Sequence, residues 1–444
     1  MRDLFVVAIV IGLAIAALRG PWIGVMLWTW LSIMNPHRYT WGLAYDAPLA
    51  AIAAIVTVLG LLLTKDERAS PFKGPQVTVL AILMVWMTLS WLLGLDVAGD
   101  YEQWKKVMKV DVMLLVALMV LHTKKHILAL AWVAVGSIAL LGVKGGVFTI
   151  LSGGVHHVFG PPGTFIEDNN AFAVALIITI PLLRFLQLQL QSNWGRTVIT
   201  IAMLLCAVGA LGSQSRGALL GLSAMALLMW WRGRSIVLGG VVIAVAAVVL
   251  VAFMPDTWSH RMSTIESYGD DRSAMGRISA WWVSWNLAFH YPLGVGFNTT
   301  RADLFAQYSP YPDLVQGAHS IYFQMLGNHG FVGLFLYLLL GVLTWTWAGW
   351  LRKNGIKRPE TQWCADLGAM SQVSLIGFAV GGAFLSLSYF DLPYIVMSMV
   401  VLARVWIQTE GWLREPKVET GWFKVPGLSQ VVPKARSRPT LSQP

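Results

Sequence analysis

Long apolar runs are the feature that most constrains the fold of this chain. A bilayer core about 30 Å thick requires about 20 apolar residues for each helical crossing. The runs are continuous rather than alternating, which indicates membrane-spanning helices and not barrel strands. The candidate spans are Ala47–Thr64, Gln76–Leu95, Val107–Leu121, His126–Thr149, Asn170–Leu188, Thr197–Gly212, Gly217–Trp231, Ser235–Met254, His319–Trp350, Asp366–Ser386 and Phe390–Ile407.

The N-terminal apolar region is interrupted. Arg19-Gly20-Pro21 separates Leu4–Leu18 from Trp22–Met34, and each piece alone makes a helix only about 21 Å long. Taken as one broken crossing, the pieces bring the total to about twelve and leave both termini in the cytoplasm. If both pieces cross, the total is about thirteen and the N-terminus lies outside. We favour the first interpretation and predict an all-α polytopic membrane protein with about twelve transmembrane helices.

Composition supports the membrane assignment. The chain is 56% hydrophobic and 12% charged, whereas an ordinary soluble domain is about 25% charged. This balance excludes a soluble globular domain and an intrinsically disordered chain. Two cysteines in 444 residues exclude a disulfide framework.

The formal charge of +10 first suggests nucleic acid as a partner. The basic residues, however, concentrate in alternate loops, as the positive-inside rule requires of cytoplasmic loops. They therefore indicate orientation and contacts with anionic membrane lipids, and no nucleic-acid partner is expected. Lys105, Lys106 and Lys109 are the main exception. The orienting residues are Lys65, Arg68, Lys73, Lys124, Lys125, Arg184, Arg196, Arg232, Arg234, Arg352, Lys353, Lys357 and Arg358, followed by those of the C-terminal tail.

One loop on the non-cytoplasmic side is exceptionally long. It runs from Pro255 to Gly317, and a long loop in a compact protein is usually functional or disordered. Within it, Met275–His290 places aromatic and aliphatic residues at helical spacing, which predicts an amphipathic helix lying in the interface or over the membrane domain. The predicted divisions are residues 1–254 for the N-terminal helices, 255–317 for the loop, 318–408 for the C-terminal helices and 409–444 for a flexible basic tail.

Three residues on the non-cytoplasmic side are candidates for a site. Arg216 lies between two apolar spans, Arg277 begins the amphipathic helix, and His319 lies where the long loop re-enters the membrane. Arginine matches phosphate oxygens and histidine accepts a proton near neutral pH, so together they suit a phosphorylated lipid. Simpler roles compete: Arg216 reaching lipid headgroups, Arg277 pairing with a nearby aspartate or stacking on Trp281, and His319 capping a helix or bonding a backbone carbonyl.

Other polar residues suggest weaker hypotheses. Asp168 or Asn169 is expected to cap the helix that follows, and Asp391 to cap the last span or contact substrate. His329 lies inside a span between glycines, which indicates either a functional group or a kink. His156-His157 lacks ligand spacing, so no metal is expected. The absence of nucleotide-binding and protease motifs argues against an ATP-driven pump and against a serine or zinc protease.

These segments together resemble the O-antigen ligase and polymerase superfamily of bacterial envelope proteins. The resemblance covers roughly Ala47 to Ile407 and includes the late loop. Asn35–Gly42 is also similar to the branch of O-glycosylation ligases associated with exosortase systems. The motifs that carry the resemblance are Ser213-Gln-Ser-Arg-Gly217, Gly276-Arg277, Pro292-Leu-Gly-Val-Gly296, Ala318-His-Ser320 and Gly327-Asn-His-Gly330.

The resemblance implies an inverting, metal-independent membrane glycosyltransferase with a GT-C-like fold and no cofactor or ATP requirement. Such a ligase moves a glycan from undecaprenyl pyrophosphate to lipid A–core at the periplasmic face of the bacterial inner membrane. The resemblance also implies that His319 is the base and that Arg216 and Arg277 are the pyrophosphate ligands. Arg261 and Arg272 are alternatives for the loop arginine. Accessory candidates are Arg38, Asn170 and Asp391.

Several functions remain open from the sequence alone. An O-antigen polymerase or a protein O-oligosaccharyltransferase uses the same kind of donor with a different acceptor. A lipid or glycan transporter without catalysis predicts ionisable residues at the membrane midplane and internal repeats. The chain has only His329 and Lys144 as intramembrane candidates and shows no clear repeat.

Overall fold

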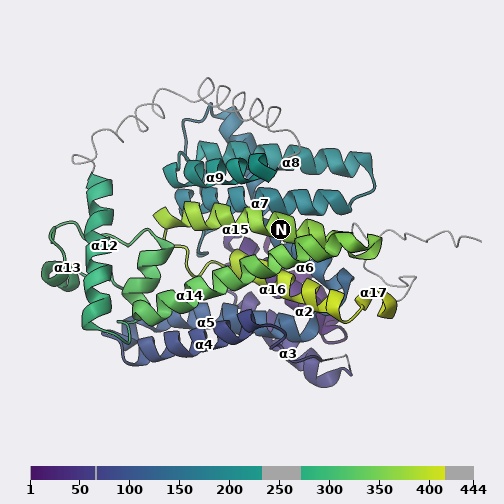
Figure 1. Ribbon diagram of the computed structural model, residues 1–444, viewed down its shortest axis with the longest axis horizontal. Helices are drawn as coiled ribbons and strands as arrows, with labels where there is room; N and C mark the ends of the chain where they lie inside the picture. The colour runs from purple at the N-terminus through teal and green to yellow at the C-terminus, as the bar shows by residue number, and fades with distance from the viewer. Residues whose placement is uncertain (1, 66–67, 233–271, 416–444) are drawn as a thin grey trace, which may run out of the picture.

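The computed structural model describes residues 2–65, 68–232 and 272–415, and all regular structure in these ranges is helical. Most helices run side by side as one bundle, while α12 crosses one end of it (Figure 1). The predicted span Ser235–Met254 lies outside the described residues. The helices are α1 (Arg2–Ala17), α2 (Pro21–Met34), η1 (Pro36–Tyr39), α3 (Leu49–Leu63), α4 (Pro75–Leu92), α5 (Val97–Val120), α6 (Lys124–Leu151), α7 (Asn169–Gln189), α8 (Asn193–Gly212), α9 (Arg216–Arg232), α12 (Arg272–His290), α13 (Ala302–Tyr308), α14 (Ile321–Asn354), η2 (Gly355–Lys357), η3 (Pro359–Thr361), α15 (Gln362–Gly381), η4 (Gly382–Phe384), α16 (Asp391–Gln408) and α17 (Gly411–Arg414).

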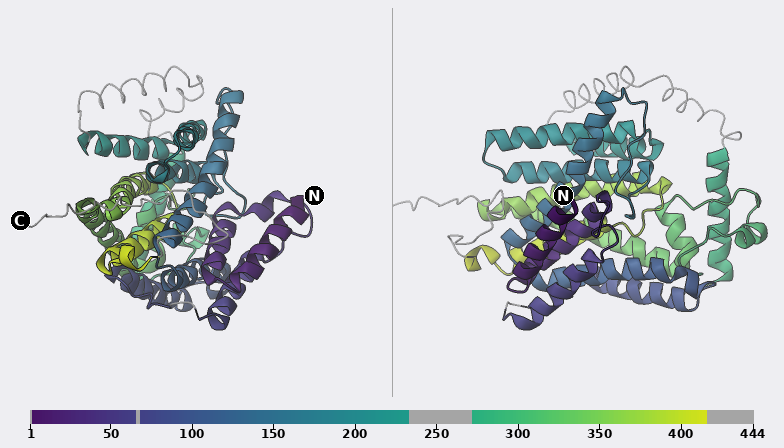
Figure 2. Two further views of the ribbon diagram at one scale, coloured as in Figure 1. Left: turned by 90° about the vertical axis from the view of Figure 1, so that its right-hand side faces the viewer. Right: turned by 180° about the vertical axis from the view of Figure 1, so that it is seen from behind.

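The broken N-terminal apolar region forms two helices, as the sequence predicts. Gly20 ends the break in an extended conformation and Pro21 occupies the first turn of α2, where its missing N–H costs no hydrogen bond. The N-terminal helices α1 to α3 group at the periphery of the bundle (Figure 2). The apolar side chains of α1 and α3 are extensively exposed, which is the surface expected to face lipid.

Seven helices in the described residues are long and apolar enough to cross a membrane. They are α4, α6, α7, α8, α14, α15 and α16, some extended by a short adjoining 3-10 turn. The helices α2 and α3 are apolar but shorter. The fold is therefore an all-helical polytopic membrane protein, and the larger total of about twelve crossings stays a prediction.

Glycines hold α6 and α8 unusually close together. A Cβ at Gly146 would lie 2.2 Å from the carbonyl oxygen of Leu205, and one at Gly142 would lie 2.5 Å from Cys206 Sγ. Gly142 and Gly146 are four residues apart on α6, so both face α8. Small residues at this spacing let transmembrane backbones pack directly, and this packing fixes the position of α8.

The two ends of the bundle differ in character. At the end where α17 lies, the Arg358 guanidinium packs over the Trp412 ring at 5.2 Å, and the backbone N–H of Lys124 donates to Glu415. These basic residues belong to the predicted cytoplasmic loops. The opposite end carries α12 and α13 (Figure 1). Charged orientation signals and the long loop thus occupy opposite ends of the molecule.

The loop after α12 is hydrogen-bonded to a kink in α14. Gly330 leaves helical geometry with φ +66° and ψ −169°. Its distortion leaves the carbonyl of Asn328 free to accept hydrogen bonds from the N–H groups of Val295 and Gly296, at 3.0 and 3.2 Å. The His329 ring is fully buried against the Tyr389 hydroxyl at 2.8 Å. His329 therefore belongs to the kink, which was one of its two predicted roles.

Candidate functional site

His319 lies at the junction between the long loop and the membrane. Its backbone is left-handed, with φ +39°, and its N–H donates to Ser386 Oγ at 3.0 Å. Ser320, not His319, caps α14 by accepting from the Phe323 N–H. The predicted capping role of His319 is therefore wrong, because the following serine performs it. The half-buried imidazole is left available for another function.

The helix α12 brings Arg277 to the same junction. Gly276 permits a close approach to Gln316, because a Cβ there would lie 2.2 Å from Gln316 Oε1. One turn later, Trp281 Nε1 donates to the carbonyl of Ala318 at 2.8 Å, and its ring stacks on Phe323 at 5.0 Å. The chain on both sides of His319 is thus bound to α12, which carries the half-buried Arg277.

The inward face of α12 carries small and aliphatic residues, and most of its aromatic residues lie on the outward face. Val283 and Leu287 are buried, whereas Trp282 and Phe289 are 50% and 60% exposed. A small core formed with α13 fixes the inward face. The predicted helix is therefore present across one end of the bundle, and its outward rings are placed for an interface or an amphiphilic ligand.

Arg216 begins α9 directly after a tight turn. Gln214 takes φ +57°, and the carbonyl of Ser213 accepts from Asn169 Nδ2 at 2.8 Å. The next residue, Gly217, touches the connector after α15, since a Cβ there would lie 3.3 Å from both Gly381 O and Phe384 Cβ. These contacts position the half-buried Arg216 against that connector.

The connector 381–386 contacts both the segment that carries Arg216 and the segment that carries His319. Its first residues contact the start of α9, and Gly382 packs against Ile321, at the start of α14. Its last residue, Ser386, binds the His319 backbone. One short segment therefore contacts both the start of α9, where Arg216 lies, and His319. Sequence reasoning missed Ser386, because a lone serine in an apolar context carries no signal for a contact 67 residues away.

The polar start of α7 lies beside this cluster. Asp168 caps the helix by accepting from the N–H groups of Asn170 and Ala171, at 2.9 and 3.2 Å. Capping by Asp168 is thus one of the two predicted outcomes and is confirmed. Asn170 donates to the side chain of Asn169 at 3.2 Å and reinforces the turn.

The electrostatic surroundings keep His319 neutral. Withdrawal from water lowers the pKa of His319 below its ordinary value of 6.5, because burial disfavours the charged ring. The Arg277 charge lowers this pKa further, while the Asp168 charge raises it. At neutral pH the imidazole is therefore available to accept a proton. The same interactions place Arg277 and Asp168 within electrostatic reach of His319.

The remaining candidates have different positions. Arg272 is exposed at the first turn of α12, and Arg261 lies outside the described residues. Arg38 and Asp391 both line a separate pocket. Asp391 does not cap α16, because the residue at the cap position is Phe390; its carboxylate instead accepts from Ser32 Oγ at 2.6 Å.

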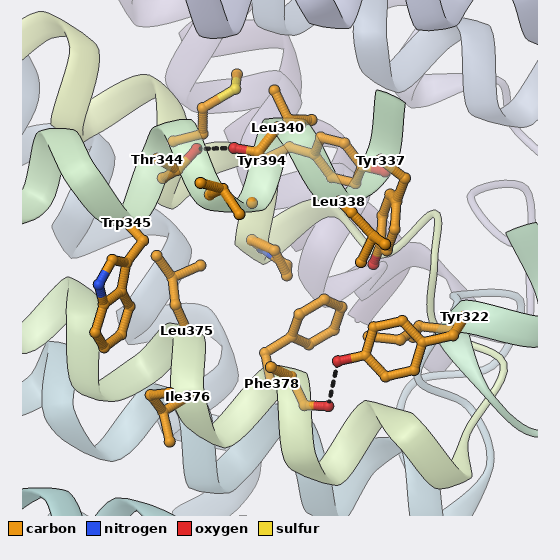
Figure 3. Close-up of a pocket in the computed structure, with 16 residues that line it drawn as sticks. Tyr322, Tyr337, Leu338, Leu340, Thr344, Trp345, Leu375, Ile376, Phe378 and Tyr394 are labelled. Atoms are coloured by element: carbon orange, nitrogen blue, oxygen red, sulfur yellow. Dashed lines mark hydrogen bonds between the residues drawn. The ribbon is translucent and has the colours of Figure 1, made fainter. Parts of the chain in front are cut away.

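An apolar pocket of about 280 Å³ opens between α14, α15 and α16 (Figure 3). It extends from Tyr322, near His319 in the chain, to Trp345. The Tyr322 hydroxyl is occupied locally, because it donates to the Ala379 carbonyl at 2.8 Å, whereas the buried Tyr337 hydroxyl has no hydrogen-bond partner among the described residues. Such a pocket suits a hydrocarbon chain rather than a polar molecule.

The fold is that of a polytopic helical membrane protein, and Arg216, Arg277 and His319 form a candidate site at one end of its bundle. Residues 201–338 match the family model described as O-Antigen ligase, and this match supports an O-antigen ligase superfamily assignment. Residues 1–190 match the model of a family of unknown function (DUF5935). No curated protein matches the chain. Arg216, Arg277 and His319 all fall within the first match, which supports a ligase- or polymerase-type function in O-antigen biosynthesis.

Proposed function

We propose that the protein is an O-antigen ligase that transfers a glycan from undecaprenyl pyrophosphate to a sugar hydroxyl of lipid A–core. Two observations carry the proposal: His319 lies within electrostatic reach of Arg277, and its backbone is bonded to the connector 381–386, which also contacts the start of α9 beside Arg216. The match of this region to the O-antigen ligase family supports it.

The chemistry follows from the residue types. In the proposed reaction Arg216 and Arg277 bind the donor pyrophosphate, and their guanidinium groups stabilise the negative charge that develops as the bond from the sugar carbon to the phosphate oxygen breaks. Pyrophosphate leaves readily, so the reaction requires no nucleotide. His319 accepts the proton of the acceptor hydroxyl as that oxygen bonds to the sugar carbon from the opposite face, which inverts the configuration.

The lipid portions of the substrates have suitable surfaces. The apolar pocket between α14, α15 and α16 begins close to His319 along the chain and accepts part of the donor's isoprenoid chain in this proposal. The outward rings of α12 border the same end and serve as a lid. The active site then faces the periplasm, and the end carrying the basic loops faces the cytoplasm.

The test is a transfer assay with purified protein. Undecaprenyl-pyrophosphate glycan and lipid A–core are supplied with a chelator and without nucleotide, and the ligated product is measured. His319→Ala is expected to lower transfer by about 10²- to 10⁴-fold, which is the usual contribution of a general base. Undiminished transfer by the folded variant refutes the proposed base.

The same assay separates ligase from polymerase, since the family match supports both types. Omitting lipid A–core leaves a ligase without an acceptor, so no glycan is transferred. Joining of donor glycans to one another under that condition identifies a polymerase. Movement of intact donor across a vesicle bilayer without transfer identifies a transporter.

A further inference from the structure

A second pocket, distinct from the apolar one, contains a concentration of charge. It measures about 510 Å³, within the range of small-molecule sites. Its walls come from α2, η1, the start of α3, the first turns of α5 and the segment 163–166. Phe390 and Asp391 complete it. Apart from those two residues, the lining belongs to the region that matches the family of unknown function.

Two of the pocket's cations are paired within the protein. Arg38 contacts the Asp46 carboxylate at 3.1 Å. Lys105 contacts Glu102 at 2.5 Å, on the same face of α5. Each pair is neutral overall, so the charge of the pocket depends on Lys106, Lys109 and Asp391.

Lys106 and Lys109 have no carboxylate within ion-pair distance in the described residues. Lys106 Nζ donates to the carbonyl of Gly163 at 3.0 Å and lies 4.1 Å from the centre of the Phe165 ring. Lys109 is exposed and makes no hydrogen bond or ion pair within the described ranges. Two ammonium groups on adjacent positions of a pocket wall attract an anion such as phosphate.

Asp391 contributes a buried acceptor to the same pocket. Its side chain is 4% exposed, and Oδ2 is bonded to Ser32. Oδ1 has no hydrogen-bond partner among the described residues. A buried carboxylate oxygen without a partner is unfavourable unless a ligand donates to it, and a hydroxyl group is a suitable donor.

Apolar side chains are exposed in the chain segments next to the pocket wall. Between Arg38 and Asp46, both in the pocket wall, Trp41 and Leu43 are 89% and 95% exposed. Just beyond, α3 begins in the wall and continues as a helix with an exposed apolar face. The polar pocket therefore opens beside a surface suited to lipid chains, as the binding of an amphiphile requires.

The pocket adjoins the proposed reaction site through two shared segments. Residues 163–166 line the pocket, while Asp168, two residues later, acts on the pKa of His319. Asp391 lines the pocket, while Ser386, five residues earlier, binds the His319 backbone. A molecule in this pocket therefore contacts the same two chain segments that carry Asp168 and Ser386.

We propose that this pocket binds the phosphorylated saccharide headgroup of a glycolipid, with Lys106 and Lys109 on its phosphate and Asp391 on a sugar hydroxyl. The proposal rests on the proposed function, in which that glycolipid is the acceptor. It assigns acceptor recognition to the N-terminal region and donor binding to residues 201–338.

The experiment measures equilibrium binding to the detergent-purified full chain. The probes are a diphosphorylated glucosamine-disaccharide lipid, the same lipid without phosphates, and phosphatidylglycerol. We expect the phosphorylated glycolipid to bind at least ten-fold more tightly than either other probe. The doubly substituted Lys106→Gln, Lys109→Gln variant is expected to lose at least ten-fold of that affinity.

Two further variants make the result specific. Lys353→Gln removes an exposed lysine at the other end of the bundle and is expected to bind as the wild type does. Asp391→Asn keeps the shape of the side chain and is expected to lower affinity for the glycolipid while leaving that for phosphatidylglycerol unchanged. Thermal stability is measured for every variant. Equal affinity for phosphatidylglycerol and the glycolipid, or wild-type affinity in the lysine variant, overturns the proposal.

Donor binding, measured on the same preparations, separates this proposal from the proposed function. We expect Arg216→Ala to lose affinity for undecaprenyl-pyrophosphate glycan and to keep its affinity for the glycolipid. We expect the lysine variant to show the reverse. Donor transfer with unaltered glycolipid binding by the lysine variant overturns the pocket assignment alone, whereas absence of donor binding by the wild type overturns the proposed function.

Discussion

The close contact between α6 and α8 leads to a prediction about catalysis at a distance. Gly146→Ala places a Cβ 2.2 Å from the Leu205 carbonyl oxygen, whereas ordinary contact begins at 3.4 Å. The helices must therefore separate by about 1 Å. Because α8 leads directly through the turn after Gly212 to Arg216, this separation displaces the proposed pyrophosphate ligand.

The expected effect is a decrease in transfer by protein that is destabilised but still folded. A misplacement of about 1 Å at a reacting group costs up to about 100-fold in rate, whereas overpacking of this size costs about 1–3 kcal/mol of stability. The assay compares kcat/KM for glycan transfer with the thermal midpoint in the same detergent. We expect a 10- to 100-fold decrease in kcat/KM, on the order of 1.4–2.8 kcal/mol, in protein that remains folded.

The matched control is Gly136→Ala. Gly136 also lies in α6, but nothing lies within 4 Å of a Cβ at that position. The control is expected to transfer glycan at the wild-type rate. Wild-type kcat/KM in Gly146→Ala, together with an unchanged thermal midpoint, refutes the reasoning that α8 positions Arg216 through this contact.

Two further predictions concern the donor chain and the proposed base. Gly341→Leu adds a side chain inside the pocket between α14, α15 and α16, at a position where nothing lies within 4 Å of a Cβ. This variant is expected to raise the donor KM about ten-fold. The control Gly136→Leu fills a different pocket and is expected to leave the donor KM unchanged. A wild-type donor KM in Gly341→Leu shows that the donor chain does not bind in that pocket. A base must be neutral, so transfer is expected to be maximal above the pKa of His319, which lies below 6.5, and to fall as the pH drops through it. In pH–rate profiles, Asp168→Asn, which keeps a capping side chain, is expected to shift this fall in rate to lower pH. Arg277→Gln is expected to shift it to higher pH. Profiles identical to that of the wild type show that neither charge acts on His319.

Hydropathy predicts the apolar parts of the helices well but not their polar ends. The break before Pro21 and the span along α6 follow from the sequence alone. The helix α5, in contrast, begins at Val97 rather than Val107, because Asp96 caps it by accepting from the Gly99 N–H. Its first turns carry the lysines that line the charged pocket, and a hydropathy pattern omits them.

The candidate site was predictable in its chemistry and not in its supports. Arg277 and His319 are recognisable because charged or imidazole-bearing residues beside apolar spans are unusual. The contacts that position them depend on backbone geometry, as in the donation from the His319 N–H to Ser386. The Ser32–Asp391 hydrogen bond joins residues 359 apart, a separation at which periodicity carries no information.

The most direct test of the central claim separates donor binding from proton transfer. Donor affinity and single-turnover transfer are measured for the wild type, Arg216→Ala, Arg277→Ala and His319→Ala. If the arginines bind pyrophosphate and the histidine is the base, both arginine variants lose at least ten-fold in donor affinity. His319→Ala then keeps its donor affinity and loses about 10²- to 10⁴-fold in transfer. Wild-type donor affinity in both arginine variants, or wild-type transfer by His319→Ala, contradicts the account.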